Sequence, residues 1–146
     1  QKDVLKNVPD KTSPLKEIDF SGRKILAAED SPDNQSLLRH FLRTTGVELT
    51  FANNGIEAVA LAMNQAFDLI LMDIQMPEMD GYEATASIRL LQRPDAKTIP
   101  IIAMTADAFD EDIQNCLKSG MNAHISKPIN PEILKKTLLK WIRYTD

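Results

Sequence analysis

The sequence predicts an α/β fold in which five parallel strands form one sheet with helices packed on both faces. Short apolar runs of strand length alternate five times with longer segments of helical periodicity. Most of these runs are continuous rather than alternating, as expected for strands buried on both faces of a parallel sheet. Successive strand-then-helix units favour right-handed crossovers, which place helices on both sides of the sheet.

Five stretches have the length and composition expected of the strands. They span residues 24–28, 47–52, 68–72, 99–104 and 122–126. The second stretch alternates polar and apolar residues, whereas the third is an apolar run with a polar start. Pro100 lies near the start of the fourth stretch, where a missing backbone donor costs least. The order of the strands within the sheet is left open by the sequence.

A segment with helical signals follows each strand. The five helices are expected to begin near residues 31, 55, 82, 107 and 131, and the first, third and fourth to end at Gly46, Leu91 and Ser119. Ser31 and Pro32 are a capping residue and a proline suited to the first helical position, and Gly120 is a C-terminal stop. The apolar residues expected to face the core are Leu37, Leu38, Phe41, Leu42, Ile56, Val59, Ala60, Met63, Ile88, Leu91, Ile133, Leu134, Leu138, Trp141 and Ile142.

The two ends of the chain differ in character. Residues 1–22 mix charged residues, Pro, Ser and Thr at no steady period, which indicates a linker or N-terminal arm, with Leu15, Ile18 and Phe20 available to dock it. Residues 23–146 then form one domain. Because the chain begins at Gln1 rather than Met, we expect a piece of a longer protein.

Composition narrows the function classes. The net charge of −4 argues against a nucleic-acid-binding surface covering the protein. No apolar run approaches the roughly 20 residues of a membrane span, so we expect no direct membrane contact. A single cysteine, Cys116, excludes an internal disulfide and suits a small core residue. We therefore expect a cytoplasmic domain.

Polar side chains fall where the predicted strands end. Asp73 follows the third strand and precedes a loop constrained by Pro77 and Gly81. The other residues at strand ends are Glu29 and Asp30 after the first strand, Thr105 after the fourth and Lys127 after the fifth. In an open parallel sheet these carboxyl ends lie along one edge, where ligands bind. The sequence therefore predicts that these five side chains share one site.

This set of side chains suits metal-assisted phosphoryl chemistry. Clustered carboxylates repel one another unless a cation lies among them, and Mg²⁺ prefers one or two carboxylates together with phosphate oxygens. A carboxylate such as Asp73 can attack phosphorus, while Lys127 and Thr105 could stabilise the charge on the phosphoryl oxygens. A plain alternative for Asp73 alone is a turn-capping aspartate.

Several separate blocks of the chain resemble the receiver domain of two-component signalling. The matching segments are LAAEDSPDN, LILMDIQMPEMDG, IPIIAMTADA and GMNAHISKPI, within about residues 23–144. The sequences QMPEMDG and GMNAHISKPI are most similar to those of receivers joined to hybrid sensor histidine kinases. The resemblance implies a doubly wound, flavodoxin-like fold, (βα)5, in which Asp73 accepts a phosphoryl group from a phosphohistidine.

The resemblance also implies a metal site. Asp30 and Asp73 would bind Mg²⁺ directly together with the backbone carbonyl of Gln75, and Glu29 would act through water; Mn²⁺ is an alternative ion. Glu29 stands where Asp is frequent in the family, which lengthens its reach to a metal-bound water. The side chain of Gln75 should face the water that hydrolyses the acyl phosphate.

The resemblance implies a conformational switch made of Thr105 and His124. Thr105 would turn inward to the phosphoryl group, which Lys127 would also contact. His124 occupies the position of an aromatic switch partner, although an ordinary half-buried histidine fits the sequence equally well. The resemblance also implies that the peptide bond between Lys127 and Pro128 is cis.

The expected phosphodonor is a histidine kinase or a histidine phosphotransfer domain. The resemblance places its docking surface on Asn34, Leu37, Leu38, Pro128 and Ile129. We expect a monomer or weak dimer and no stand-alone enzyme. The resemblance also implies that the parent chain could be a hybrid histidine kinase, with this domain as the cytoplasmic part of a membrane-bound sensor kinase.

Three alternatives remain at this stage. A Mg²⁺-dependent phosphohydrolase would use the same aspartyl-phosphate step, but it generally needs an acid two residues after the nucleophile, where this chain has Gln75. A receiver-like interaction module would keep only the fold and not be phosphorylated. A dinucleotide-binding domain is disfavoured because the turn after the first strand has no glycine cradle.

Overall fold

One parallel sheet of five strands organises the protein. The computed structural model describes residues 18–106 and 109–142. The strands are β1 (Lys24–Ala28), β2 (Glu48–Ala52), β3 (Leu69–Asp73), β4 (Ile101–Thr105) and β5 (Ala123–Ser126). Their spatial order is β2-β1-β3-β4-β5, and every neighbouring pair is parallel. This is the doubly wound order of flavodoxin-like folds, so the predicted fold class is confirmed.

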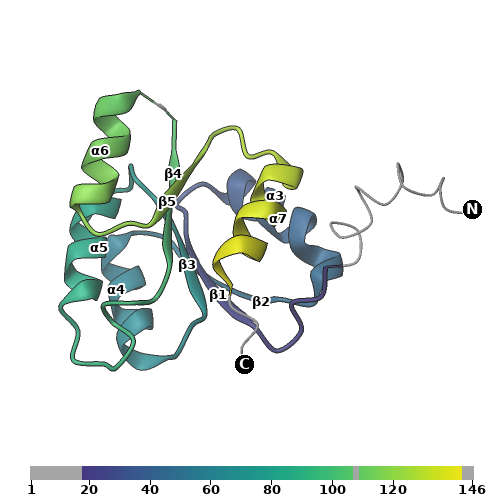
Figure 1. Cartoon of the computed structure of the whole chain (residues 1–146), viewed down its shortest axis with the longest axis horizontal. Helices are drawn as coiled ribbons and strands as arrows, with labels where there is room; N and C mark the ends of the chain where they lie inside the picture. The colour runs from purple at the N-terminus through teal and green to yellow at the C-terminus, as the bar shows by residue number, and fades with distance from the viewer. Residues whose placement is uncertain (1–17, 107–108, 143–146) are drawn as a thin grey trace, which may run out of the picture.

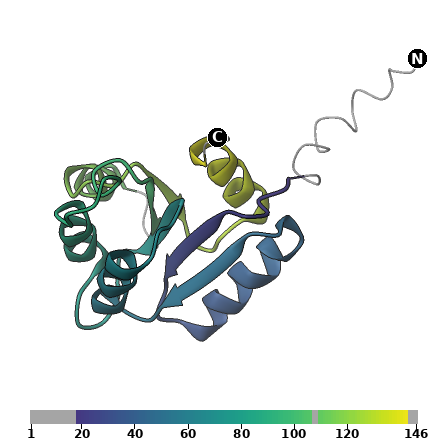
Figure 2. The same cartoon turned by 90° about the horizontal axis from the view of Figure 1, so that it is seen from below.

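Helices cover both faces of the sheet. They are α3 (Pro32–Leu42), the short 3₁₀ helix η2 (Arg43–Thr45), α4 (Gly55–Asn64), α5 (Gly81–Arg89), α6 (Asp110–Lys118) and α7 (Pro131–Trp141). Figures 1 and 2 show α3 and α7 on one side of the sheet and α4, α5 and α6 on the other. None of the described helices is long and apolar enough to cross a membrane.

Successive residues along each strand pack alternately into two separate cores, one on each face of the sheet. Leu26, Ile70 and Ala103 point toward α4, α5 and α6, where Ala58, Ala84, Ile88 and Cys116 complete one buried cluster. The opposite core joins α3 and α7 to the sheet through Ile25, Leu71, Ile102, Leu38, Leu42, Leu134 and Leu138. Side chains of the central strands therefore pack on both faces, which explains why β1, β3 and β4 are almost continuously apolar. Cys116 is a buried core residue, as predicted.

Local capping chemistry fixes the helix starts. The Ser31 side chain accepts a hydrogen bond from the backbone of Asn34, and Pro32 occupies the first turn of α3, as predicted. Asp80 and Glu83 form a reciprocal capping box at the start of α5. Gly120 follows α6 with φ +108°, a conformation that favours glycine. These signals are local, which is why the sequence predicted most boundaries within about two residues.

The buried face predicted for α4 was wrong for Ile56, Ala60 and Met63, whereas Val59 is partly buried against the core. Ile56 and Met63 are 50% and 55% exposed, and Ala60 is exposed as well, whereas Gly55, Ala58 and Ala62 face the core. The reason is close packing at the start of the helix, because a Cβ on Gly55 would collide with the backbone oxygen of Met79. Small residues allow this approach, so the larger apolar residues point outward.

Smaller departures occur at helix ends and in α7. The helix α5 ends at Arg89 rather than Leu91, and Leu91 is only partly buried. In α7, Ile133 is 53% exposed, contrary to prediction, while Leu134, Leu138 and Ile142 are buried. Ile133 lies one position from Leu134, about 100° around the helix, so both cannot face the same core.

Residues next to the first strand pack against the domain. Ile18 and Phe20 are buried in the cluster beneath α3 and α7, and the Phe20 amide donates to the Thr45 carbonyl. These two contacts support the predicted docking of the arm, whereas Leu15 lies outside the described residues. The start of the predicted fourth helix at residue 107 also lies outside them. The boundary between residues 22 and 23 remains a prediction.

Candidate functional site

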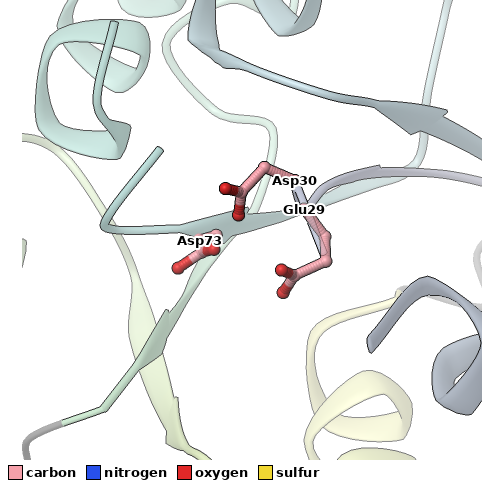
Figure 3. A group of neighbouring side chains, drawn as sticks. All are labelled: Glu29, Asp30 and Asp73. Atoms are coloured by element: carbon pink, nitrogen blue, oxygen red, sulfur yellow. The ribbon is translucent and has the colours of Figure 1, made fainter. Parts of the chain in front are cut away.

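The carboxyl edge of the sheet gathers the five polar residues predicted from the sequence. Glu29 and Asp30 follow β1, Asp73 ends β3, Thr105 ends β4 and Lys127 follows β5. All five line a cleft of about 700 Å³ at this edge. Figure 3 shows the side chains of Glu29, Asp30 and Asp73 gathered around the end of β3. Oxygen atoms from these three carboxylates lie within 4.8 Å of one another.

Lys127 links two of the acids. Its Nζ lies 3.2 Å from Glu29 Oε1 and 3.2 Å from Asp73 Oδ2. Glu29 and Asp73 are almost fully buried, at 1% and 4% exposure. Because a buried carboxylate without a counter-charge is costly, the lysine is part of what makes this arrangement stable. The Lys127–Pro128 peptide bond is cis, as predicted.

Burial and like charge act together on Asp73. Desolvation and the neighbouring Glu29 carboxylate raise the pKa of Asp73 to about 6, even though Lys127 and the Gln75 amide favour the ionised form. Burial works to lower the pKa of Lys127, but Asp73 and Glu29 outweigh it, so this pKa is raised. The lysine therefore remains a cation at neutral pH. Its single positive charge is shared between Glu29 and Asp73, so it does not fully compensate the Asp73 carboxylate.

The acids form a site that suits a hard divalent cation. Glu29 Oε1 is buried, and among the described residues its polar neighbour is the Lys127 ammonium at 3.2 Å, in a geometry poor for a hydrogen bond. The buried Glu29 oxygen, beside the carboxylates of Asp30 and Asp73, gives a cluster of hard oxygen donors that suits Mg²⁺. The residues present therefore fit the ion implied by the sequence.

The loop after Asp73 is held tightly. The Gly81 amide donates to the Ile74 carbonyl, and a Cβ at Gly81 would collide with the Asp73 backbone oxygen. The Gln75 amide donates to Asp73 Oδ1 at 3.2 Å. Glu78 has φ +70°, which is unfavourable for a residue other than glycine. The chain thus folds back on itself directly after the central carboxylate, which is buried in the lining of the cleft.

Comparison with known proteins agrees with this geometry. Residues 25–139 match the sequence profile of the response regulator receiver domain. The chain belongs to this family. It is 40% identical over 114 residues to the sensor histidine kinase RcsC of Salmonella typhimurium, an alignment that covers 78% of this chain. The receiver therefore spans only 12% of the length of that relative.

Solved receiver domains share the fold. The receiver domain of a sensor histidine kinase from Pseudomonas aeruginosa PAO1 has a TM-score of 0.77 and 42% identity, covering 84% of this chain and 98% of that one. That protein has magnesium coordinated in its active-site cleft. The receiver of the Saccharomyces cerevisiae response regulator Ssk1 has a TM-score of 0.75 and 32% identity, covering 84% and 90%. It was crystallised with a histidine phosphotransfer protein.

The two switch candidates of this receiver occupy neighbouring strands. Thr105 pairs with Ser126 in the register of β4 and β5, and His124 lies two residues before Ser126. Because side chains alternate along a strand, Thr105 and His124 share one face of the sheet. Thr105 is buried and His124 is half-buried. The register therefore places the two residues on one face of neighbouring strands and assigns His124 no further role.

The predicted docking residues divide by exposure. Leu37 is 41% exposed on α3, Pro128 is exposed, and Asn34 and Ile129 are half-buried. Leu38 is only 1% exposed and packs in the core, so its assignment to the receiver's docking surface was wrong. Leu37 and Leu38 are adjacent on a helix and therefore point about 100° apart, which leaves only Leu37 for a partner.

Sequence reasoning missed one residue that touches the acidic pair. Gln35 on α3 donates from Nε2 to the Glu29 backbone oxygen at 2.7 Å and to Asn53 Oδ1 at 3.0 Å. A polar residue one turn into a helix is usually solvated, so nothing in the pattern marks Gln35. Only the approach of the β1–α3 and β2–α4 loops reveals these contacts.

Proposed function

We propose that this receiver domain accepts a phosphoryl group on Asp73 from the phosphohistidine of a histidine kinase or histidine phosphotransfer domain. The observation that carries the proposal is the position of Asp73, buried among acids and 3.2 Å from the Lys127 ammonium. A carboxylate so placed is a nucleophile with a cation beside the oxygens that gain charge. The accepting oxygen belongs to the Asp73 carboxylate, and the new bond is an acyl phosphate.

The transfer step balances without any further co-reactant. An Asp73 oxygen attacks phosphorus, the bond between phosphorus and the donor imidazole nitrogen breaks, and that nitrogen keeps the electron pair. Lys127 would remain protonated throughout. Its ammonium would first pair with the Asp73 carboxylate and then with the oxygens of the transferred phosphoryl group. Thr105 would add a hydroxyl donor to these oxygens from the end of β4, a position that supports its role as a switch.

Mg²⁺ is the cofactor we propose for this site, with Mn²⁺ as an alternative. Asp30, Asp73 and the backbone carbonyl of Gln75 would hold the ion, and Glu29 would act through water. When bound, the ion neutralises the acids and the transferring phosphoryl group. The acidic cluster and its buried Glu29 oxygen support this assignment.

The phosphodonor would dock beside the cleft. Half-buried Asn34 lines the cleft, the Pro128–Ile129 segment directly follows Lys127, and exposed Leu37 lies about one turn further along α3. Leu37 supplies the apolar anchor of this surface. Phosphorylation would then shift the population of the domain through Thr105, with His124 as its partner on β5.

The protein context is also a proposal. We infer that the receiver is the cytoplasmic part of a hybrid histidine kinase, with residues 1–22 as the linker and residues 23–146 as the receiver. It would act as a monomer or weak dimer, without contact to nucleic acid or membrane. The similarity to sensor histidine kinases along the receiver supports this context.

Intact-mass analysis tests the proposal. The protein incubated with Mg²⁺ and phosphoramidate should gain one phosphoryl group, whereas Asp73→Asn and samples in EDTA should gain none. Asp33→Asn, at an exposed acid in the first turn of α3, is the matched control and should be modified like the wild type. An unmodified wild type would overturn the proposal. Release of many phosphates per chain would instead favour the phosphohydrolase alternative.

A further inference from the structure

We propose that Gln35 is a positioning residue that orients the Glu29–Asp30 pair and thereby sets the affinity of the cleft for Mg²⁺. The inference rests on the proposed Mg²⁺ site. Both amide hydrogens of the Gln35 side chain are used: one is donated to the Glu29 backbone oxygen at 2.7 Å and the other to Asn53 Oδ1 at 3.0 Å. Gln35 is not among the residues that line the cleft, so it would act only through its neighbours.

The Glu29 carbonyl is an effective point of control. It belongs to the peptide unit that joins Glu29 to Asp30, and this unit is planar. A hydrogen bond that fixes the direction of the carbonyl therefore also fixes the direction in which the chain enters Asp30. The Glu29 amide is already held by the Ala52 carbonyl at 2.9 Å. With Gln35 in place, both sides of Glu29 are anchored.

Asp30 depends on this backbone more than Glu29 does. The Glu29 carboxylate has its own contacts with the Ser31 amide and Lys127. By contrast, Asp30 is exposed, and within residues 18–106 and 109–142 no hydrogen bond or ion pair holds its carboxylate. Its place in the cluster is therefore set by the backbone. A metal ligand of this kind loses orientation when the peptide before it is free to rotate.

The second contact of Gln35 gives it a rigid support. Asn53 lies in the loop between β2 and α4, and its amide donates to Glu57 Oε1 at 2.8 Å. Glu57 in turn donates its amide to Asn54 Oδ1, the N-cap of α4, at 2.8 Å. A chain of hydrogen bonds thus runs from the first turn of α4 through Asn53 and Gln35 to the Glu29 carbonyl. Such outer partners typically tune metal affinity through the ligands they orient.

Titration with MgCl₂ alone, followed by amide chemical shifts in NMR spectra, tests the inference. Gln35→Ala removes both hydrogen bonds, and we expect its Mg²⁺ dissociation constant to rise about tenfold, the lower end for outer partners of a metal site. The matched control is Gln114→Ala, at an exposed glutamine on α6, which should bind Mg²⁺ within twofold of the wild type. Equal affinity of Gln35→Ala and wild type would overturn the inference.

A second variant separates orientation from charge. Gln35→Glu keeps the size of the side chain but, when ionised, offers acceptors only, so it would repel the Glu29 oxygen. Extra negative charge alone would tighten Mg²⁺ binding, whereas a positioning role predicts weaker binding than in the wild type. Tighter binding by Gln35→Glu would therefore contradict the proposal.

Two readouts keep the outcomes distinct. The Asn53 amide resonance should shift on Mg²⁺ addition in the wild type and lose that response in Gln35→Ala, which a merely stabilising contact would not cause. Urea unfolding in EDTA shows whether Gln35→Ala is folded; lower stability with unchanged Mg²⁺ affinity would assign Gln35 a structural role only and overturn the inference. A wild type that does not respond to Mg²⁺ would refute the proposed metal site instead.

Discussion

Ionised Asp73 should destabilise the metal-free domain, so Asp73→Asn should stabilise it. The pKa of Asp73 rises from 3.8 to about 6 on folding, because of burial and the neighbouring Glu29 carboxylate. The folded protein therefore holds this proton more tightly than the unfolded chain does. Below pH 3.8 the contribution of Asp73 to the free energy of unfolding is at its full value. This contribution is lost as the pH rises from 3.8 toward 6, and above that pH it no longer changes. Asn resembles the protonated carboxyl group and avoids the loss.

The size of the effect follows from the same values. Each pH unit between 3.8 and about 6 corresponds to about 1.4 kcal/mol, which sets a ceiling of about 3 kcal/mol at neutral pH. Because the cleft is open to water, screening reduces the ceiling. We therefore expect Asp73→Asn to raise the free energy of unfolding by about 1–2 kcal/mol at pH 7.5 in EDTA.

Urea unfolding at two pH values is the assay. The gain from Asp73→Asn should be largest at pH 7.5 and much smaller at pH 4.5, where the wild-type group is protonated in the folded state. Asp33→Asn, at an exposed position on α3, should change stability by less than about 0.5 kcal/mol at either pH. A gain that does not depend on pH, or a less stable Asp73→Asn at pH 7.5, would refute the electrostatic argument.

Three further outcomes follow from the structure. Mg²⁺ at 100 times its dissociation constant should stabilise the wild type by about 2.7 kcal/mol in urea unfolding, with a much smaller effect on Asp73→Asn; equal stabilisation of both would place the ion elsewhere. Leu37→Glu should slow phosphoryl transfer from a phosphorylated histidine phosphotransfer domain but leave labelling by phosphoramidate unchanged. The control Leu90→Glu, at a 77% exposed leucine far from Leu37 in the sequence, should leave both reactions unchanged. Equal loss of Leu37→Glu labelling with both donors would argue against a docking role. Glu78→Val should lower the free energy of unfolding by about 1–2 kcal/mol, because a β-branched residue fits φ +70° poorly. Glu78→Gly should not lower it. An equal loss in the two variants would show that side-chain contacts, and not the backbone, decide stability at this position.

The sequence was sufficient where topology alone decides. Any parallel sheet brings the ends of its strands to one edge, so the meeting of Asp73, Glu29 and Lys127 could be predicted without knowing the strand order. The contacts of Lys127 with two acids agree with this reasoning. The helix starts were equally accessible, because Ser31 and Pro32 act within one turn.

The sequence was insufficient where several packings satisfy the same pattern. The helix α4 is apolar on nearly all sides, so periodicity could not show that Ala58 and Ala62 would face the core in preference to Ile56 and Met63. The tight contact between Gly55 and Met79 favours small residues at the start of this face, and periodicity does not encode that contact. Adjacent leucines on α3 posed the same ambiguity. The bond from Gln35 to the Glu29 carbonyl depends on where two loops meet, and no residue pattern encodes that distance.

Chemical trapping of the phosphorylated residue tests the central claim most directly. Sodium borohydride reduces an acyl phosphate to an alcohol and leaves homoserine where the aspartate stood. After incubation with phosphoramidate and Mg²⁺, peptide mass spectrometry should locate homoserine at Asp73, and samples in EDTA should show none. Trapping at Asp30, Glu29 or another acid, or no trapping at all, would contradict the assignment of Asp73 as the phosphoryl acceptor.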